Sequence, residues 1–314
     1  MKHSHAAPLI WANLIHLGYN MWEDRPDPRI HRRYPARLAQ PYVRFDEKLW
    51  DDLLVRMTAA GVNMVILDLG EAVRYESHPE LAARGAWSHA KLRRELARMR
   101  KLGIEVIPKM NFSSTHDAWL GVYGRQVSTD TYYAVCRELI AEAIELFDTP
   151  RFFHLGMDEE TAVEQEFQSH AVLRQHDLWW HDLRFLVDQV ERRNVRAWVW
   201  SDYMWFHEED YLRKMPRSVL QSNWYYGPDV TSRWFKVKAF LTLEKHGYDQ
   251  VPAGSNWLHA ENMPRLVRYL GGRIGPERLK GFMQTPWQPT IPAYRRHHIQ
   301  AIDQLARAKR VWDG

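Results

Sequence analysis

The chain has 314 residues, of which 45% are hydrophobic and 26% charged, an ordinary composition for a globular protein. Its net charge of +4 comes from 43 basic and 39 acidic residues spread along the chain, which argues against nucleic acid as a partner. A single cysteine, Cys136, excludes an internal disulfide framework. No apolar run reaches membrane-spanning length and no signal-peptide pattern follows Met1, so we expect a cytoplasmic protein that does not contact membranes.

Strand-like and helix-like segments alternate along the chain. Short apolar runs predict eight strands, at residues 8–18, 62–68, 104–108, 151–155, 196–200, 219–224, 250–256 and 279–285. Apolar residues at helical spacing predict helices at residues 45–60, 88–102, 129–147, 179–193, 233–246, 262–269 and 293–312. Ser88 is expected to cap the second of these helices, and Gly103 to end it.

This alternation predicts an α/β protein with the architecture of a single (β/α)8 barrel over residues 1–314. The competing fold, a doubly wound open sheet, usually carries a glycine-rich phosphate turn after its first strand, and this chain has none there. Residues 19–42 contain four prolines and five arginines and are too irregular for a barrel element. We expect them to form a long loop over one rim.

Acids, amides and aromatic residues are predicted at the carboxyl ends of the strands, where (β/α)8 enzymes have their active sites. The candidates for sugar binding are Asp68, Asn111, His116, His154, Trp200, Asp202, Trp224, Tyr225 and Trp287. The chain also has 15 Trp and 14 Tyr, and aromatic faces stack on sugar rings as well as fill cores. This composition favours a carbohydrate over a phosphorylated ligand, which would need glycine turns and several basic groups.

The segment 151–160 is the most informative part of the chain. A short buried strand ends at Gly156-Met157 and is followed at once by the acids Asp158, Glu159 and Glu160. A glycosidase needs one carboxyl group to protonate the leaving oxygen and another to stabilise positive charge at the sugar carbon. The alternative is that an acid in this run caps the next helix, as acids near helix N-termini often do.

The chain resembles the β-N-acetylhexosaminidases of glycoside hydrolase family 20. Their fourth strand carries His-x-Gly-Gly-Asp-Glu, and this chain has His154-Leu-Gly-Met-Asp-Glu159. The run from Gly103 to Pro108 is similar to the family's third strand, and His116 follows it as a histidine does in the family. Trp200-Ser-Asp202 after the fifth strand and the last strand ending at Trp287 are also similar.

Several positions depart from the family pattern. Met157 replaces the second glycine of the motif, and Lys109 replaces a glutamate. No arginine follows the first strand, where the family binds sugar hydroxyls, and Gly227 and Pro289 stand where acids are expected. The resemblance therefore implies a distant relative that keeps the catalytic pair while much of the sugar-holding shell differs.

The resemblance implies that Glu159 is the general acid and base, and that Asp158 orients the 2-acetamido group that attacks the anomeric carbon. The resemblance also implies that Trp200, Trp224 and Trp287 wall the acetamido pocket, with packing in the barrel core as the alternative. Either Tyr225 or Tyr226 would donate a hydrogen bond to the acetamido oxygen. Asp68 would bind sugar hydroxyls or bridge to Lys109. His154 would support the site or fill the barrel. We expect no cofactor and no metal, because the pairs His3/His5 and His297/His298 lack ligand spacing and are interpreted as surface residues.

The sequence therefore predicts a retaining, exo-acting glycoside hydrolase that acts on N-acetylhexosaminide-containing glycans. Two alternatives stay open. In the first, Asp202 or another rim acid is the nucleophile for a sugar that lacks the acetamido group. In the second, the barrel binds carbohydrate without catalysis. No pattern in the sequence addresses the oligomeric state.

Overall fold

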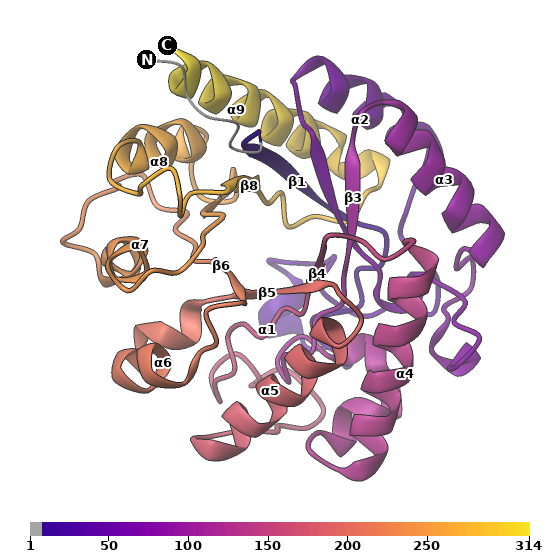
Figure 1. Ribbon diagram of the computed structural model, residues 1–314. Helices are drawn as coiled ribbons and strands as arrows, with labels where there is room; N and C mark the ends of the chain where they lie inside the picture. The colour runs from indigo at the N-terminus through magenta and orange to yellow at the C-terminus, as the bar shows by residue number, and fades with distance from the viewer. Residues whose placement is uncertain (1–7) are drawn as a thin grey trace.

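A computed structural model describes residues 8–314, and its core is an eight-stranded parallel barrel surrounded by helices (Figure 1). The strands are β1 (Ile10–His16), β2 (Met64–Asp68), β3 (Glu105–Lys109), β4 (Phe152–His154), β5 (Arg196–Trp200), β6 (Leu220–Ser222), β7 (Ala253–Gly254) and β8 (Gly281–Gln284). Their order in the sheet is β6-β5-β4-β3-β2-β1-β8-β7. Parallel bridges between Gln221 and Gln250 and between Trp224 and Ala253 join β6 to β7. The predicted (β/α)8 fold is therefore confirmed.

Alternation along the strands separates the barrel interior from the layer beneath the helices. In β1, Ile10, Ala12 and Leu14 belong to a small inner cluster with residues such as Met64 and Trp198 of other strands. Trp11 and Ile15 belong instead to the larger cluster that packs under the helices. Strands buried on both faces read as nearly continuous apolar runs, which is why the sequence predicted strands such as β1 and β2.

The surrounding helices are α2 (Glu47–Ala59), α3 (His89–Lys101), α4 (Asp130–Leu146), α5 (Asp177–Glu191), α6 (Glu208–Lys214), α7 (Phe235–Lys245), α8 (Asn262–Leu270) and α9 (Arg295–Asp313). Ser88 caps α3 through its hydroxyl, as predicted, and Thr129 caps α4 in the same way. The sequence did not predict α6. That helix has seven residues and buries only Tyr211, so it carries too little apolar periodicity to be recognised.

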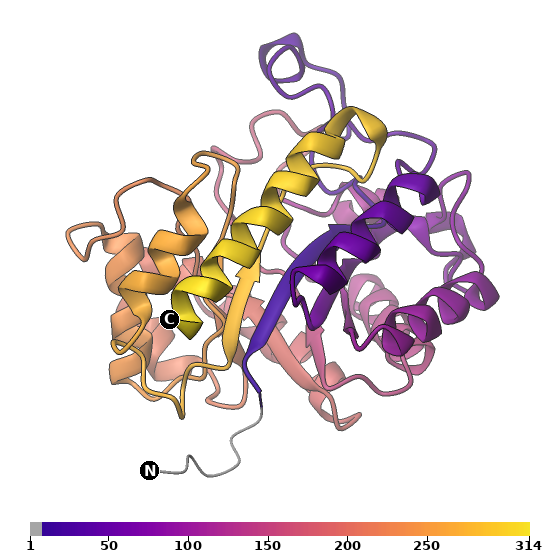
Figure 2. The same cartoon turned by 90° about the horizontal axis from the view of Figure 1, so that it is seen from above.

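The loop predicted at residues 19–42 contains one short helix, α1 (Pro28–His31), capped by Asp27. In Figure 2 this segment protrudes beyond the helices at the end of the molecule toward which β1 points. It is tied to the loop after β4, because the guanidinium of Arg25 donates to the carbonyl oxygens of Glu166 and Phe167. The segment therefore lies over the carboxyl ends of the strands.

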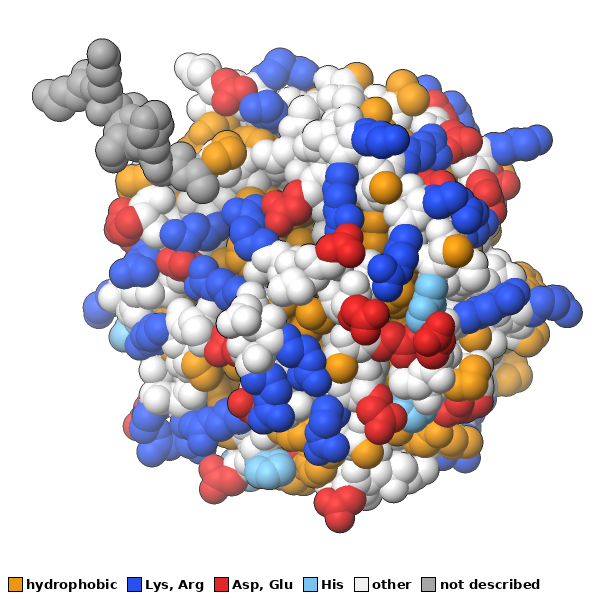
Figure 3. Space-filling view, turned by 45° about the vertical axis from the view of Figure 1, so that its right-hand side comes forward, with side chains coloured by type: hydrophobic (Ala, Val, Ile, Leu, Met, Phe, Trp, Pro, Cys, Tyr) orange, Lys and Arg blue, Asp and Glu red, His pale blue; other side chains and the backbone are white. Residues whose placement is uncertain are grey.

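The surface of the barrel mixes both signs of charge. Figure 3 shows Lys and Arg side chains interleaved with Asp and Glu over the face that it presents. Within residues 8–314, no helix is both long enough and apolar enough to cross a membrane.

Candidate active site at the barrel mouth

The chain leaves β4 through an unusual backbone turn. Gly156, Met157 and Glu159 all have positive φ, at 74°, 73° and 58°. A side chain at Gly156 would place its Cβ 1.9 Å from Oδ1 of Asn111, so only glycine fits there. The turn breaks the alternation of strand side chains, and Asp158 and Glu159 consequently both line one cavity.

Asp158 is held by two groups from the loop after β3. The side-chain amide of Asn111 donates to its Oδ1 at 2.8 Å, and Nε2 of His116 lies 3.4 Å from its Oδ2. Burial alone would raise the pKa of Asp158, but the charge of His116, the ammonium of Lys109 and these hydrogen bonds lower it overall. Asp158 is therefore an ionised carboxylate at neutral pH.

His116 lies between the two acids. Its Nε2 is also 3.4 Å from Oε2 of Glu159. Burial lowers the pKa of His116, but Asp158 and Glu159 outweigh that effect and raise it to about 10. A protonated imidazole thus bridges the pair and offsets the repulsion between two adjacent carboxylates.

These three side chains also have the composition of a metal site. Their ligand atoms lie within 4.8 Å of one another. A metal ligand must be a neutral imidazole, however, and His116 carries protons on both nitrogens when it bridges the acids. Metal binding would have to compete with that protonation, and the expectation of a metal-free site stays a prediction.

Asp202 contacts Glu159 from the other side. Its Oδ2 accepts the backbone N–H of Glu159 at 2.9 Å, and Nε1 of Trp224 lies 3.5 Å from its Oδ1. Burial, together with the charge of Asp158, raises the pKa of Asp202 to about 8. Asp202 is therefore mainly neutral at pH 7, and its contact fixes the backbone of Glu159 in the left-handed conformation.

The acids open into a cavity of about 240 Å³ that is walled by aromatic rings. The rings of Trp224 and Tyr226 stack at 4.9 Å, and Nε1 of Trp287 donates to the Tyr226 hydroxyl at 3.0 Å. The remaining lining residues come from the loops after β1, β4 and β7: Tyr19, Trp22, Tyr34, Arg37, Glu164, Trp257 and Leu258. This shape and chemistry suit a sugar ring.

The sequence did not single out Trp22, Arg37 or Glu164 as site residues. Trp22 packs edge-on against His116, with ring centroids 4.8 Å apart, and the Arg37 guanidinium lies 4.4 Å from the Trp22 ring. Arg37 also pairs with Glu23, and this pairing holds its side chain against the cavity wall. The long loop after the first strand was the available signal, but nothing in its composition distinguished these residues from their neighbours.

Two predicted site residues, Asp68 and His154, lie beneath the cavity, in the top layer of the barrel interior. Asp68 is paired with Lys109 at 2.7 Å and with His16 at 3.1 Å, so the bridge to Lys109 is present and no free carboxylate points toward a sugar. His154 accepts a hydrogen bond from Gly156 N–H and packs on Trp200 at 4.7 Å. Burial lowers the pKa of His154 to about 3, so it is neutral.

For Trp200, and for the choice between Tyr225 and Tyr226, the structure favours the second of the two alternatives. The Trp200 ring is 1% exposed and lies beneath Trp287, with ring centroids 5.8 Å apart, so it supports the cavity floor instead of forming a wall. Tyr225 does not line the cavity, and its neighbour Tyr226 takes that place. Adjacent residues after a strand end point in different directions, and sequence cannot tell which one faces inward.

The two histidine pairs that were interpreted as surface residues have different outcomes. His298 is 1% exposed and bonds to the carbonyl oxygen of Pro289, so that interpretation was wrong for it. It lies on the buried face of α9, and burial lowers its pKa to about 4. His297 is half-buried, and its Nε2 lies within hydrogen-bond distance of the Pro286 carbonyl oxygen. His3 and His5 fall outside the described residues.

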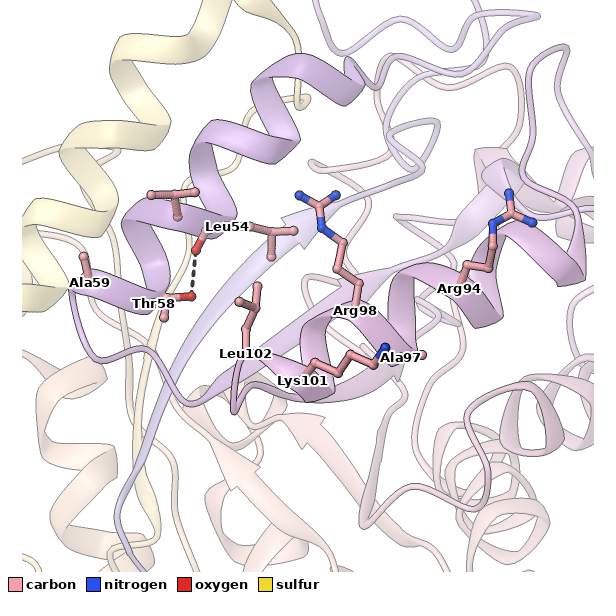
Figure 4. A pocket seen from close by; sticks show the side chains of 9 residues that line it. Leu54, Thr58, Ala59, Arg94, Ala97, Arg98, Lys101 and Leu102 are labelled. Atoms are coloured by element: carbon pink, nitrogen blue, oxygen red, sulfur yellow. Dashed lines mark hydrogen bonds between the residues drawn. The ribbon is translucent and has the colours of Figure 1, made fainter.

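A larger groove of about 790 Å³ lies on the outer surface, between α2 and α3 (Figure 4). Its lining is mainly apolar, with a basic rim formed by Arg94, Arg98 and Lys101. It shares no residue with the barrel mouth and contains no acid. This groove offers no carboxyl group, so the barrel mouth, where two acids line a cavity, is the candidate active site.

Comparison with known proteins gives structural matches only. No family model and no curated protein match the sequence. Among solved structures, the β-N-acetylhexosaminidase from Bacteroides fragilis is similar at a TM-score of 0.62 and 13% identity, over 94% of this chain and 65% of that one. The family 20 exo-β-N-acetylglucosaminidase from Vibrio harveyi, solved with N-acetylglucosamine, gives 0.62 and 13%, over 97% of this chain and 57% of that one.

A structure from work on the tandem family 20 catalytic modules of the pneumococcal exo-β-D-N-acetylglucosaminidase StrH is similar at a TM-score of 0.63 and 13% identity, over 97% of this chain and 84% of that one. The chain spans less than two thirds of the length of the first two structures. At such identities, these matches establish a shared fold. The resemblance read from the sequence is thus confirmed at the level of the fold.

Proposed function

We propose that this chain is a retaining, exo-acting glycoside hydrolase of the β-N-acetylhexosaminidase type, in which the substrate's own 2-acetamido group is the nucleophile. The observation that carries the proposal is the group formed by Asp158, Glu159 and His116. Two acids with different environments stand side by side in an aromatic cavity. The shared fold with family 20 enzymes supports the same conclusion.

In the first step, the acetamido oxygen attacks C1 and the bond from C1 to the glycosidic oxygen breaks. Glu159 gives its proton to that oxygen, and the leaving group departs as an alcohol. Positive charge then spreads over the oxazolinium ring, where the ionised Asp158 stabilises it. The anchoring of Asp158 by Asn111 keeps this carboxylate in place as charge develops.

In the second step, water attacks C1 from the face that the leaving group vacated. The Glu159 carboxylate accepts a proton from that water, and the bond from C1 to the acetamido oxygen breaks. The product is the free sugar with its original anomeric configuration. One residue thus acts first as acid and then as base, as microscopic reversibility requires.

The alternative with Asp202 as a protein nucleophile is less well supported. A nucleophilic carboxylate must be ionised, whereas burial and the charge of Asp158 raise the pKa of Asp202 to about 8. Its Oδ2 is also occupied by the backbone N–H of Glu159. A catalytically silent barrel would have no need for two acids bridged by a buried histidine.

The sugar-holding residues differ from those expected of the family. We propose that residues of the loop after β1 bind the sugar hydroxyls in their place. Arg37 brings a guanidinium to the cavity from that loop, and Glu164 brings a carboxylate from the loop after β4. Both are placed to bind hydroxyl groups through charge-assisted hydrogen bonds. We therefore expect weak activity on simple aryl N-acetylglucosaminides and better activity on a longer or modified glycan.

The test compares paired glycosides with and without the 2-acetamido group, together with a thiazoline that mimics the oxazoline intermediate. We expect hydrolysis of the acetamido sugar alone, retention of anomeric configuration by NMR, and competitive inhibition by the thiazoline. Equal rates on both sugars without thiazoline inhibition would rule out the substrate's acetamido group as the nucleophile. Sugar binding without any turnover would support the silent barrel.

A further inference from the structure

A second cavity of about 280 Å³ adjoins the first and shares Glu159 and Glu164 with it. Its other walls come from the end of β4, the loop after β5 and the start of α7, and they include Glu160, Asp202, Trp205, Phe206 and Lys236. Asp158 lines only the first cavity. The side chain of Glu159 therefore stands at the boundary between two spaces of different composition.

If the proposed function holds, this boundary has a direct chemical meaning. A general acid contacts the oxygen that joins the two parts of the substrate, so one part lies on each side of it. Asp158, which stabilises the oxazolinium, assigns the first cavity to the acetamido sugar. The second cavity then receives the leaving group.

Lys236 gives the second cavity a distinctive charge. Its Nζ lies 4.1 Å from the ring centre of Trp205 and 4.5 Å from that of Trp224. Within residues 8–314, no carboxylate oxygen lies within 4.0 Å of this ammonium group. A half-buried cation that is held by two indole rings and has no ion pair is available to bind an anion.

The neighbouring acids offset this charge only in part. Asp202 is mainly neutral at pH 7, because burial and Asp158 raise its pKa. Glu159 must carry a proton when the substrate binds, because it serves as the acid. Glu160 also lines the cavity but is paired with Arg174, so Glu164 is the remaining carboxylate, and burial raises its pKa.

We propose that the second cavity is a leaving-group subsite in which Lys236 selects glycans with an acidic substituent on the sugar that departs. The recognising chemistry is an ammonium paired with a carboxylate, sulfate or phosphate oxygen. Phe206, which is 72% exposed, also lines this subsite and offers an exposed ring to the same sugar. The opposite preference, for an amino sugar, would require Glu164 to dominate.

The test uses three disaccharides that share an N-acetylglucosaminyl group and differ only in the leaving sugar: a uronic acid, the matching neutral hexose and the matching amino sugar. We expect kcat/KM to be about 10–100-fold higher for the acidic disaccharide than for the neutral one, and lowest for the amino sugar. The preference should weaken as salt is added, because the pair is partly exposed to solvent.

Lys236→Met should bring the ratio of acidic to neutral kcat/KM close to one, and Lys236→Arg should keep most of it. Lys238→Met is the matched control, since Lys238 is an exposed lysine on the same helix. This control should retain the wild-type ratio. A ratio near one in the wild-type protein, or a preference for the amino sugar, overturns the assignment to Lys236.

Binding is measured in parallel by calorimetry with Glu159→Gln, so that the test does not depend on turnover. Tighter binding of the acidic disaccharide without hydrolysis by wild-type protein would refute the proposed function and support the subsite. Hydrolysis of all three at equal rates would refute the subsite and support the function. Failure to bind or hydrolyse any of them would refute both.

Discussion

Two clusters of histidine and carboxylate lie one above the other in this barrel, and only one of them has access to a ligand. His16, Asp68 and Lys109 occupy adjacent register positions at the ends of β1, β2 and β3. Their side chains are almost completely buried and bond to one another. His116, Asp158 and Glu159 stand on loops beyond the strand ends, and the two acids line a cavity.

The difference shows that position relative to the strand end decides the role. The last inward residue of a strand still belongs to the packed interior of the barrel, so a charged group there must be neutralised by its neighbours. Residues beyond the strand end can turn toward solvent. The same residue types thus stabilise the fold in one cluster and are available for chemistry in the other.

Glu159→Gln tests the cluster that lines the cavity, and it should have the largest effect on turnover. The glutamine keeps the shape but cannot protonate the leaving group, so turnover of unactivated glycosides should fall by about 10²–10⁴-fold. Aryl glycosides with good leaving groups should lose less, because they need less protonation. Steady-state kinetics on both substrate types measures this, and normal hydrolysis of natural glycosides would place the acid elsewhere.

Asp68→Asn should have the opposite profile. It removes the ion-pair partner of the fully buried Lys109 and should lower the free energy of unfolding by about 3–5 kcal/mol in denaturant titrations. The variant that remains folded should keep its turnover. Asp51→Asn, which disrupts a pair with Arg98 on the exposed surface, is the control and should leave stability nearly unchanged. A large loss of turnover with normal stability would show that Asp68 acts in catalysis instead of stabilising the fold.

His116→Gln should change the pH profile of activity. Without the imidazolium, Asp158 loses the leading influence that lowers its pKa against the effect of burial. The acidic limb of kcat against pH that reflects ionisation of Asp158 should therefore shift to higher pH. An unchanged profile would show that His116 does not control the ionisation of the pair.

The smallest expected effect is on stability at alkaline pH. The pKa of His116 is raised to about 10 in the folded protein, from an ordinary value of 6.5. Its ion pairs therefore contribute fully below pH 6.5, and this contribution is lost as pH rises through 10. The difference in Tm between wild-type protein and His116→Gln should shrink over that range. A constant difference would contradict the raised pKa.

The sequence determined the barrel and the location of the acids. Apolar runs and helical spacing are local properties of the chain. They predicted the strands and main helices correctly because each strand is buried on both faces and each main helix buries one face. The motif ending at Asp158 and Glu159 also depends on local chain geometry. Gly156 fits because a Cβ there would collide with Asn111.

Only the tertiary structure decided which neighbours face the cavity. Asp68 and Trp200 are the last residues of their strands and face into the barrel, whereas Tyr226 and Trp287 lie beyond strand ends. Arg37 reaches the site because its loop folds back over the barrel mouth. The physical reason is that periodicity fixes direction inside a strand, while beyond the strand end the direction of a side chain depends on contacts with residues far away in the chain.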